Sequence, residues 1–413
     1  MTNSSGCRYA CKRSRRRKVL ATACVLSTFA VTPAFGEDAP GPTAEAAPAK
    51  EPEKKESLRS IFFDEQDGAL DLSNWLLKKK GFLPVPIIIT EPAVGYGGGL
   101  AAVFFSQSIE EAIEQSKTTG HRTPPDVYAL AAAKTENGTD FIGGGGMVSF
   151  LDDRWRYRGF VGHADLHLDF YGGGNIVDKE YKIAYQLNGW FSYQQALYRL
   201  GESDNFVSAR WLYMSLDSSF DGNRPNLPQQ SFAMKNSGIG TSFEHDSRDN
   251  IFTPSRGVLA VADAMFYDPD WGGDTRFQTY RAHVFAYHPV GNSLVLAGRL
   301  DGRAARGDVP FYMLPYLDMR GMAGARYQDR NTALAEVEAR WNVTPRWGLI
   351  GFVGAGRAWG TTVNFNDATN EVSKGVGFRY QIARLLGVWT GMDYAWGPDG
   401  EQAFYIQVGS AWR

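Results

Sequence analysis

Four ionisable side chains stand two residues apart in the segment HADLHLDF, residues 163–170, and their types could support chemistry. They are His163, Asp165, His167 and Asp169, and every residue between them is apolar. Imidazole and carboxylate groups bind metal ions and transfer protons. Side chains two apart share one face of a strand but lie about 7 Å apart, so one metal ion rarely binds three of them without a bulge. The segment therefore predicts a two-faced strand in the wall of a barrel, rather than a metal site or a catalytic pair.

The rest of the chain offers little competing chemistry. There is no Gly-x-Ser-x-Gly nucleophile elbow, and all three cysteines, Cys7, Cys11 and Cys24, lie within the first 36 residues. After removal of that leader the chain would hold no thiolate ligand and no disulfide. The remaining histidines are scattered, at His121, His245, His283 and His288. We therefore expect no enzymatic activity, no metal site and no cofactor.

The N-terminus of the chain has the organisation of a secretory signal peptide. Arginines and a lysine at residues 13–18 precede an apolar run, Val19 to Val31, and small residues follow at Ala34 and Gly36. This order predicts a signal peptide over residues 1–36. Residues 37–57 are rich in Pro, Ala, Glu and Lys, which predicts a disordered linker. The net charge of −2, from 43 basic and 45 acidic residues, gives no reason to expect a nucleic-acid partner.

A short helical segment is expected over residues 58–81. Ser73 could cap a helix, the lysines at 78–80 suit the negative end of its dipole, and Gly81 could end it. No apolar run after the leader approaches the length of about 18 residues that a membrane-spanning helix needs.

From residue 82 to the end, apolar and polar residues alternate in strands of about ten residues. In TALAEVEARW, for example, Val337 stands on the apolar face and Glu336, Glu338 and Arg340 on the polar one. Together with export, absence of cysteine and many tyrosines and tryptophans near strand ends, this favours an all-β transmembrane antiparallel barrel. We count about 16 strands, the first being LPVPIII, with 14 as the alternative. Polar faces, including that of His163, Asp165, His167 and Asp169, are expected to line the lumen.

One segment carries a resemblance to a known family. FEHDSRDNIFTPSRGVLA, residues 243–260, has an Asp-x-Arg-Asp-Asn turn followed by Thr-Pro and Gly. It resembles the signature of the bacterial surface antigen family, the barrels of the outer-membrane assembly factors BamA and TamA. Side chains of the turn can satisfy its amides, the proline stiffens the loop, and the glycine allows the chain to re-enter the sheet. The matching residues are Asp246, Arg248, Asp249, Asn250, Pro254 and Gly257.

A second motif, YLDMRGM at residues 316–322, resembles the loop that folds into the lumen of those barrels. The resemblance implies that Arg320, followed by Gly321, pairs with Glu338 or Glu336 of the next strand. A buried arginine needs such a partner, because an unpaired buried charge is costly. Two residues depart from the family pattern: Met322 replaces an aromatic residue, and Gly354 replaces an aspartate that would be a further partner of the arginine.

In FYIQVGSAWR, at the end of the chain, the alternation from Phe404 to Trp412 predicts a last strand over residues 403–412. Its Val408, Gly409 and Trp412 resemble the last-strand signal of outer-membrane barrels. The resemblance extends over residues 82–413. It does not include the linker, where relatives carry POTRA repeats, since the roughly 45 residues before the barrel are too few to fold one.

The resemblance implies a barrel in the bacterial outer membrane that assists insertion or translocation of protein or lipid. Its partners would be the lipid bilayer and, during its own insertion, the barrel-assembly machinery. A seam between first and last strands, weakened by Gly97–Gly99 and by Gly409, would be the opening. Two alternatives stay open: a passive channel or structural barrel that has lost the assembly role, and, less favoured, an enzyme that acts on lipid.

Overall fold

The computed structural model describes residues 62–78, 81–108, 110–111, 114, 125–170, 183–220, 231–361 and 363–412. The expected signal peptide and linker lie outside this range, as do two of the three lysines at the end of the expected helix. The described residues include no helix long and apolar enough to cross a membrane.

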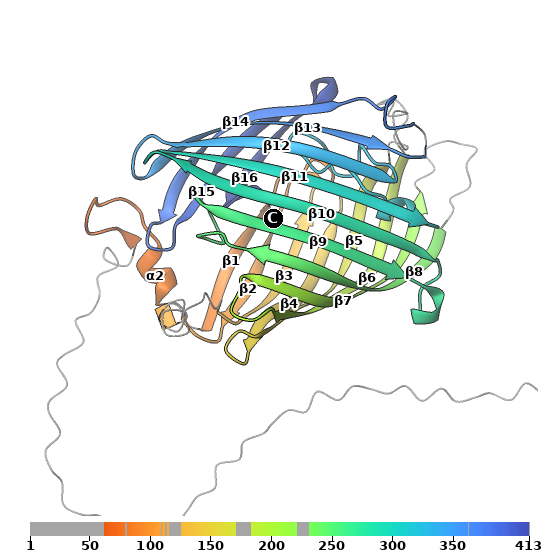
Figure 1. Cartoon of the computed structure of the whole chain (residues 1–413), viewed down its shortest axis with the longest axis horizontal. Helices are drawn as coiled ribbons and strands as arrows, with labels where there is room; N and C mark the ends of the chain where they lie inside the picture. The colour runs from red at the N-terminus through yellow and green to blue at the C-terminus, as the bar shows by residue number, and fades with distance from the viewer. Residues whose placement is uncertain are drawn as a thin grey trace, which may run out of the picture. The chain divides into compact units, whose positions relative to one another are not determined.

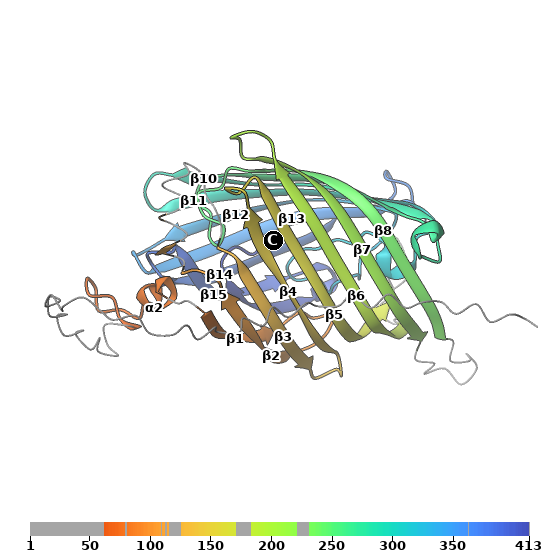
Figure 2. The ribbon, with the colours of Figure 1, turned by 90° about the horizontal axis from the view of Figure 1, so that it is seen from below.

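Sixteen antiparallel strands form one sheet in which each strand pairs with the next along the chain. The sheet curls into a nearly closed barrel (Figures 1 and 2), which confirms the predicted fold and the count of sixteen strands rather than fourteen. The strands are β1 (Gly81–Ile89), β2 (Gly97–Phe105), β3 (Val127–Thr135), β4 (Asp140–Phe150), β5 (Trp155–Phe170), β6 (Ile183–Arg199), β7 (Asn205–Phe220), β8 (Ser231–Asp246), β9 (Gly257–Tyr267), β10 (Phe277–Val290), β11 (Leu294–Gly307), β12 (Asn331–Asn342), β13 (Trp347–Trp359), β14 (Glu371–Ala383), β15 (Val388–Trp396) and β16 (Gln402–Val408).

The barrel has a polar interior and an apolar exterior. On β12, Glu336 is 3% exposed, whereas the next residue, Val337, is 57% exposed. The same inversion places Arg379 and Asp393 among the most buried side chains and leaves Leu130 69% exposed. Because a soluble barrel would bury its apolar side chains, this arrangement is that of a membrane barrel.

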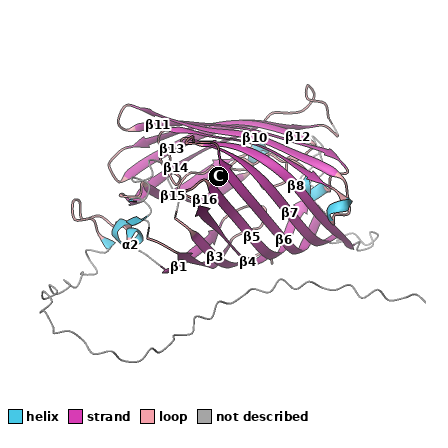
Figure 3. Cartoon of the chain, turned by 60° about the horizontal axis from the view of Figure 1, so that its bottom comes forward, coloured by secondary structure: helices cyan, strands magenta, loops and turns pink. Residues whose placement is uncertain are grey.

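The strands differ greatly in length. β5 to β8 have 16 or 17 residues each, whereas β1, β2 and β3 have nine and β16 has seven. We call the end of the barrel where β1 begins and β16 ends the proximal end, and the other the distal end. The wall is therefore tall at β5 to β8 and short where the first and last strands approach each other (Figure 3).

The ionisable face of HADLHLDF points outward, which corrects the expectation that it lines the lumen. His163 lies opposite Trp190 of β6, with ring centroids 5.2 Å apart, and Trp190 is 57% exposed. Ala164, on the other face, is 6% exposed. Aromatic residues mark the borders of a membrane-facing band, and a strand of this length extends past such a border.

Beyond Trp190 the outer face of the tall wall is polar. Asp165 accepts a 2.6 Å hydrogen bond from the Gln186 side chain, and His167 lies 3.4 Å from Asp165. The alternation at His163, Asp165, His167 and Asp169 was correctly recognised as strand. Its face was assigned wrongly, because the distal part of β5 stands above the apolar band, where ionisable groups meet water outside the barrel.

The short helix forms as α2 (Ser73–Leu77), beside the proximal end of the barrel (Figure 1). Ser73 is not its cap: the preceding Leu72 holds that position, and the Asp71 carboxylate accepts the Ser73 N–H at 2.7 Å. The Ser73 hydroxyl instead accepts the backbone N–H of Leu385. Gly81 begins β1.

Candidate functional site

The connection between β11 and β12, residues 308–330, folds into the lumen, and we call it the lumen loop. Its first part contains the 3-10 helix η3 (Phe311–Met313), and the Phe311 ring meets Tyr185 of β6 edge-on at 5.0 Å. Further along, Leu317 and Met319 are buried in a cluster with Leu334 of β12. The loop is thus held by apolar contacts before it reaches its charged centre.

Arg320 is the charged centre of the lumen loop and is 8% exposed. Its Nε donates to Glu336 Oε1 at 3.1 Å, and its Nη2 lies 2.7 Å from Glu338 Oε2. Its guanidinium carbon lies 3.4 Å from the ring centroid of Phe352. The structure therefore brings Arg320 to both glutamates that the sequence placed on the lumen face.

A third carboxylate was missed by the sequence reasoning. Asp393 of β15 receives Arg320 Nη1 at 2.9 Å and both terminal nitrogens of Arg379, at 2.6 and 2.9 Å. Gly354 lies beside Glu336, so that a Cβ there would be 3.1 Å from Glu336 Cγ. The sequence feature that could have identified Asp393 is the alternation in GMDYAW, residues 391–396, which places this aspartate on the polar face of its strand.

The other departure, Met322, is accommodated by packing. Its side chain is 2% exposed and belongs to the same buried cluster as Tyr327 and Leu334. A flexible thioether can fill an irregular space of this kind. Gly321, beside it, has φ +90°, a conformation that favours glycine.

The seam between β1 and β16 has no backbone ladder within the described residues, although every other pair of neighbouring strands is hydrogen-bonded. The lumen loop crosses this seam on the inside. The Gly321 N–H donates to Tyr405 Oη of β16 at 2.9 Å, and the Gly324 N–H donates to Glu91 Oε1, between β1 and β2, at 3.2 Å. Burial raises the pKa of Glu91. One loop thus contacts both sides of the seam.

The turn motif lies at the proximal end, between β8 and β9. Asp249 Oδ1 accepts the amides of Ser255 and Arg256 at 2.8 and 3.1 Å, and Asn250 Oδ1 accepts those of Phe252 and Thr253. Asp246 holds Arg248 through two 2.8 Å hydrogen bonds. Gly257 has φ +101°, and a Cβ there would lie 2.2 Å from the Ser247 carbonyl oxygen, so the turn requires glycine.

This turn also reaches across the proximal end. Asn250 Nδ2 donates to the Leu386 carbonyl at 2.8 Å, and Arg340 Nη2 donates to the carbonyl of buried Pro254 at 3.0 Å. The Ser410 N–H donates to the Phe252 carbonyl at 2.6 Å. The motif therefore ties β8 and β9 to the C-terminal half of the barrel.

The C-terminal residues do not continue the last strand as expected. β16 ends at Val408, and Gly409 has φ +83°. Trp412 then turns into the lumen, is 4% exposed and packs with Phe285 and Tyr287 of β10. The expected alternation up to residue 412 was wrong, because the left-handed glycine directs the tail inward.

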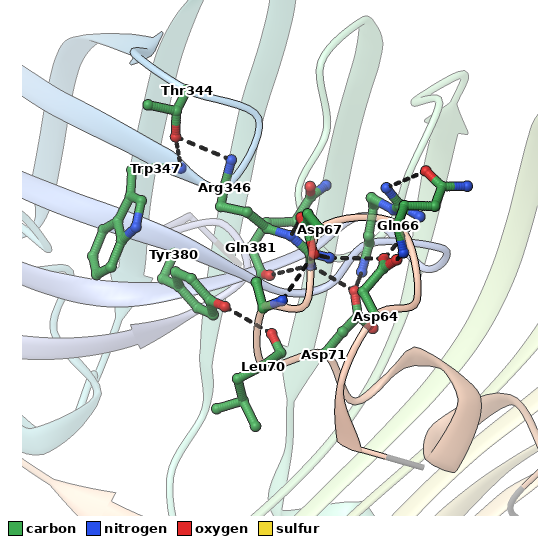
Figure 4. Close-up of polar contacts among 12 residues, drawn as sticks. Asp64, Gln66, Asp67, Leu70, Asp71, Thr344, Arg346, Trp347, Tyr380 and Gln381 are labelled. Carbon is green, nitrogen blue, oxygen red and sulfur yellow. Dashed lines mark hydrogen bonds and ion pairs between the residues drawn. The ribbon is translucent and has the colours of Figure 1, made fainter. Parts of the chain in front are cut away.

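A cluster of carboxylates holds the N-terminal segment on the proximal turns (Figure 4). Arg346, between β12 and β13, contacts Asp64 at 2.8 Å, Asp67 at 2.6 Å and Asp71 at 2.6 Å. Arg384, between β14 and β15, contacts Asp64 at 2.7 Å. We call residues 64–71 with these two arginines the clasp.

The clasp shifts the carboxylate pKa values. The hydrogen bond from Arg346 lowers the pKa of Asp67 to about 2. Burial acts to raise the pKa of Asp71, but hydrogen bonds from Ser73 and Arg346 outweigh it and leave that pKa lowered. Among the residues that the structure describes, no group of three or more histidine, cysteine, aspartate or glutamate side chains could hold a metal ion.

Comparison with known proteins agrees with this geometry. The Omp85 superfamily domain matches residues 181–412. BamA from Haemophilus ducreyi lacking POTRA domains 1-3 has a similar structure, with TM-score 0.55 and 12% identity over 80% of this chain and 70% of that one. CdiB from Acinetobacter baumannii has TM-score 0.50 and 10% identity, over 79% of this chain. CdiB from Escherichia coli has TM-score 0.50 and 8% identity, also over 79%.

This chain spans 59% and 61% of the two CdiB chains, and at these identities the likeness concerns the fold alone. No curated protein matches the sequence. Because the superfamily domain matches more than half of the residues, the chain belongs to the Omp85 superfamily.

Proposed function

We propose that this Omp85 barrel resides in the bacterial outer membrane and assists the insertion or translocation of other proteins, or of lipid, through a seam between β1 and β16. The observation that carries the proposal is that, within the described part of the chain, every pair of neighbouring strands shares a hydrogen-bonded ladder except these two. Unpaired strand edges are templates for incoming strands. The apolar outer face supports residence in a bilayer, and the family of the chain supports the same location.

The lumen loop is proposed to latch the seam. It contacts β16 through Tyr405 and the connection between β1 and β2 through Glu91, while Arg320 anchors it to β12 and β15. In this arrangement the seam can open only when the loop releases one side. The anchor at Arg320 would keep the loop in the lumen during that movement.

The interior favours this proposal over a passive channel. The lumen loop enters from the distal end, and at the proximal end the β8–β9 turn and the C-terminal tail meet through Phe252 and Ser410. These segments lie inside the barrel, where Leu317 packs with Leu334 of β12 and Trp412 packs with Phe285 of β10.

A disulfide across the latch tests the proposal. A Cβ on Gly324 would lie 3.5 Å from the Cβ of Ala93, which is within the range of disulfide-bonded cysteines. The variant A93C/G324C would thus join the lumen loop to the β1–β2 connection when oxidised. The sequence has no cysteine after Cys24 to interfere. The matched control is A262C/A282C, whose residues lie opposite each other on β9 and β10, away from the seam.

Each variant is reconstituted in liposomes, and the insertion of an unfolded barrel protein is followed by protease protection. Oxidised A93C/G324C should slow insertion to the rate of empty liposomes, and reduction should restore it, while the control stays active in both states. Wild-type protein that inserts clients no faster than empty liposomes would refute the proposed function.

A further inference from the structure

The N-terminal segment exposes two apolar side chains side by side. We call residues 62–71 the N-terminal hairpin, because Phe63 and Leu70 form an isolated antiparallel bridge within it. The Asp64 N–H donates to the Ala69 carbonyl at 2.9 Å, which makes Phe63 and Leu70 a pair without hydrogen bonds between them. In such a pair the two side chains lie close together on one face. Phe63 is 41% exposed and Leu70 is 43% exposed.

The clasp holds the other face of the hairpin on the barrel. Asp64 and Asp71 each stand one residue from the bridge, so their side chains point away from those of Phe63 and Leu70. Arg346 contacts both carboxylates, at 2.8 and 2.6 Å. The two apolar side chains therefore have a fixed direction, away from the arginines at the proximal turns.

The hairpin lies beside the aromatic border of the membrane-facing surface. Trp347 and Tyr380 lie opposite each other at the proximal ends of β13 and β14, with ring centroids 4.9 Å apart. Trp347 is 49% exposed on the outer face, and the next outward residue of its strand toward the distal end, Leu349, is 50% exposed. Because tryptophan and tyrosine are enriched where the apolar band meets water, this pair marks the proximal border of the band.

The Tyr380 hydroxyl connects this border to the hairpin. It donates to the Leu70 carbonyl at 2.7 Å (Figure 4). A tyrosine at a membrane interface keeps its ring in the apolar region and directs its hydroxyl to the headgroups and water. Here the main chain of the hairpin accepts that hydrogen bond. Leu70 thus lies at the depth of the lipid headgroups, with Phe63 beside it.

We propose that the N-terminal hairpin is a membrane-binding foot, whose Phe63 and Leu70 insert into the proximal surface of the bilayer that surrounds the barrel. The partner is the boundary between headgroups and acyl chains. Residues 62–71 contain four carboxylates and no basic residue, so burial of apolar side chains, rather than attraction to anionic lipid, drives the contact. The proposal depends on the membrane barrel and not on the insertion or translocation of other molecules.

Depth-dependent quenching on the full chain in phosphatidylcholine nanodiscs tests this contact. Single cysteines, F63C or L70C, carry a fluorophore in a chain with serine at the three leader cysteines, and the lipids carry a nitroxide near the headgroup or near the chain end. Both labels should be quenched most by the shallow nitroxide, as expected for insertion about 5–10 Å deep.

Two labelled positions on the barrel calibrate the depth. V353C, on the outer face of β13, should be quenched most by the deep nitroxide, since Val353 is 47% exposed within the apolar band. E202C, in the exposed β6–β7 connection at the same end of the barrel, should be quenched little. Quenching of F63C and L70C no stronger than that of E202C would overturn the proposal.

The variant F63S/L70S removes the apolar pair and keeps the clasp. In nanodiscs, proteinase K at pH 7 should cleave residues 62–78 about tenfold faster than in wild type, because the bilayer no longer holds the hairpin closed. In an amphipathic polymer, which offers no bilayer surface, variant and wild type should be cleaved alike. E65S, at the exposed turn of the hairpin, is the matched control and should behave as wild type in both.

Two results of the cleavage experiment would contradict the foot. One is equal cleavage of F63S/L70S and wild type in nanodiscs. The other is the same acceleration in the polymer, which would mean that the pair stabilises the hairpin itself rather than a contact with lipid. Neither experiment measures client insertion, so failure of the insertion assay refutes the proposed function and leaves the foot unaffected.

Discussion

Asp393 of β15 lies 2.9 Å from Arg320 Nη1 and provides a carboxylate that the resemblance to the surface antigen family implies at residue 354. An aspartate at residue 354 would crowd Glu336, whereas Asp393 approaches the guanidinium group from two strands further along the sheet. The lock of the lumen loop thus keeps three carboxylates and spans β12 to β15. Its anchor is close to the seam, since β15 is the neighbour of β16.

Asp393→Asn is expected to destabilise the barrel strongly. The change removes a carboxylate that two buried arginines, Arg320 and Arg379, both contact directly. Removing one member of a buried ion pair costs about 3–5 kcal/mol. Urea unfolding in micelles, followed by tryptophan fluorescence, measures the loss. The control Asp270→Asn, on the exposed surface, should change stability by less than about 0.5 kcal/mol. A D393N barrel as stable as wild type would show that Asp393 is not part of the lock.

Tyr405→Phe is expected to loosen the latch without unfolding the barrel. It removes the acceptor of the Gly321 N–H, a contribution of about 0.5–1.5 kcal/mol. Hydrogen exchange at residues 321–326 should become faster, because the loop then loses its contact with β16. Tyr394→Phe is the matched control, since that hydroxyl contacts Gln402 rather than the loop. Equal exchange in Y405F and wild type would argue against a latch at Tyr405.

Trp412→Ala should create a cavity in the lumen. The indole packs with Leu259, Phe285 and Tyr287, and replacing a buried tryptophan with alanine costs about 3–5 kcal/mol. The same change on an outward tryptophan, Trp341→Ala, should cost less, because that side chain is 53% exposed. Unfolding in micelles compares the two. A larger loss at Trp341 would mean that the tail does not occupy the lumen in solution.

The sequence predicted the strands well because alternation is a local property. The expected count of sixteen strands was confirmed, and Glu336 and Glu338 could be assigned to the polar face from the sequence of β12 alone. Which face of β5 points inward could not be found in this way, since the polar distal part of a long strand has the same pattern as a lumen face. The clasp and Asp393 were missed for another reason. Their partners are distant in sequence, as with Arg346 and Asp71, and only the closed sheet brings them together.

Acid should release the clasp. The pKa of Asp67 is lowered to about 2 and that of Asp71 is also lowered, in both cases with hydrogen bonds from Arg346 contributing. A carboxylate whose pKa is lowered in the folded state stabilises the folded state at pH values above its unfolded pKa, about 3.9. This stabilisation is lost as the pH falls toward the pKa of the folded state. Protease cleavage within residues 62–78 should therefore be slow at pH 7 and at pH 5, and accelerate between about pH 4 and pH 2.

Proteinase K at pH 7 and pepsin at pH 5 and below permit this measurement, with peptides from the β6–β7 connection, residues 200–204, as the internal reference for general unfolding. Arg346→Gln should make residues 62–78 sensitive already at pH 5, because the guanidinium that joins Asp64, Asp67 and Asp71 is gone. Arg276→Gln, which removes an exposed arginine paired with Asp268, is the matched control and should leave the cleavage profile unchanged. If R346Q and wild type are cleaved alike across the whole pH range, the ion pairs of Arg346 do not hold the N-terminal segment in place.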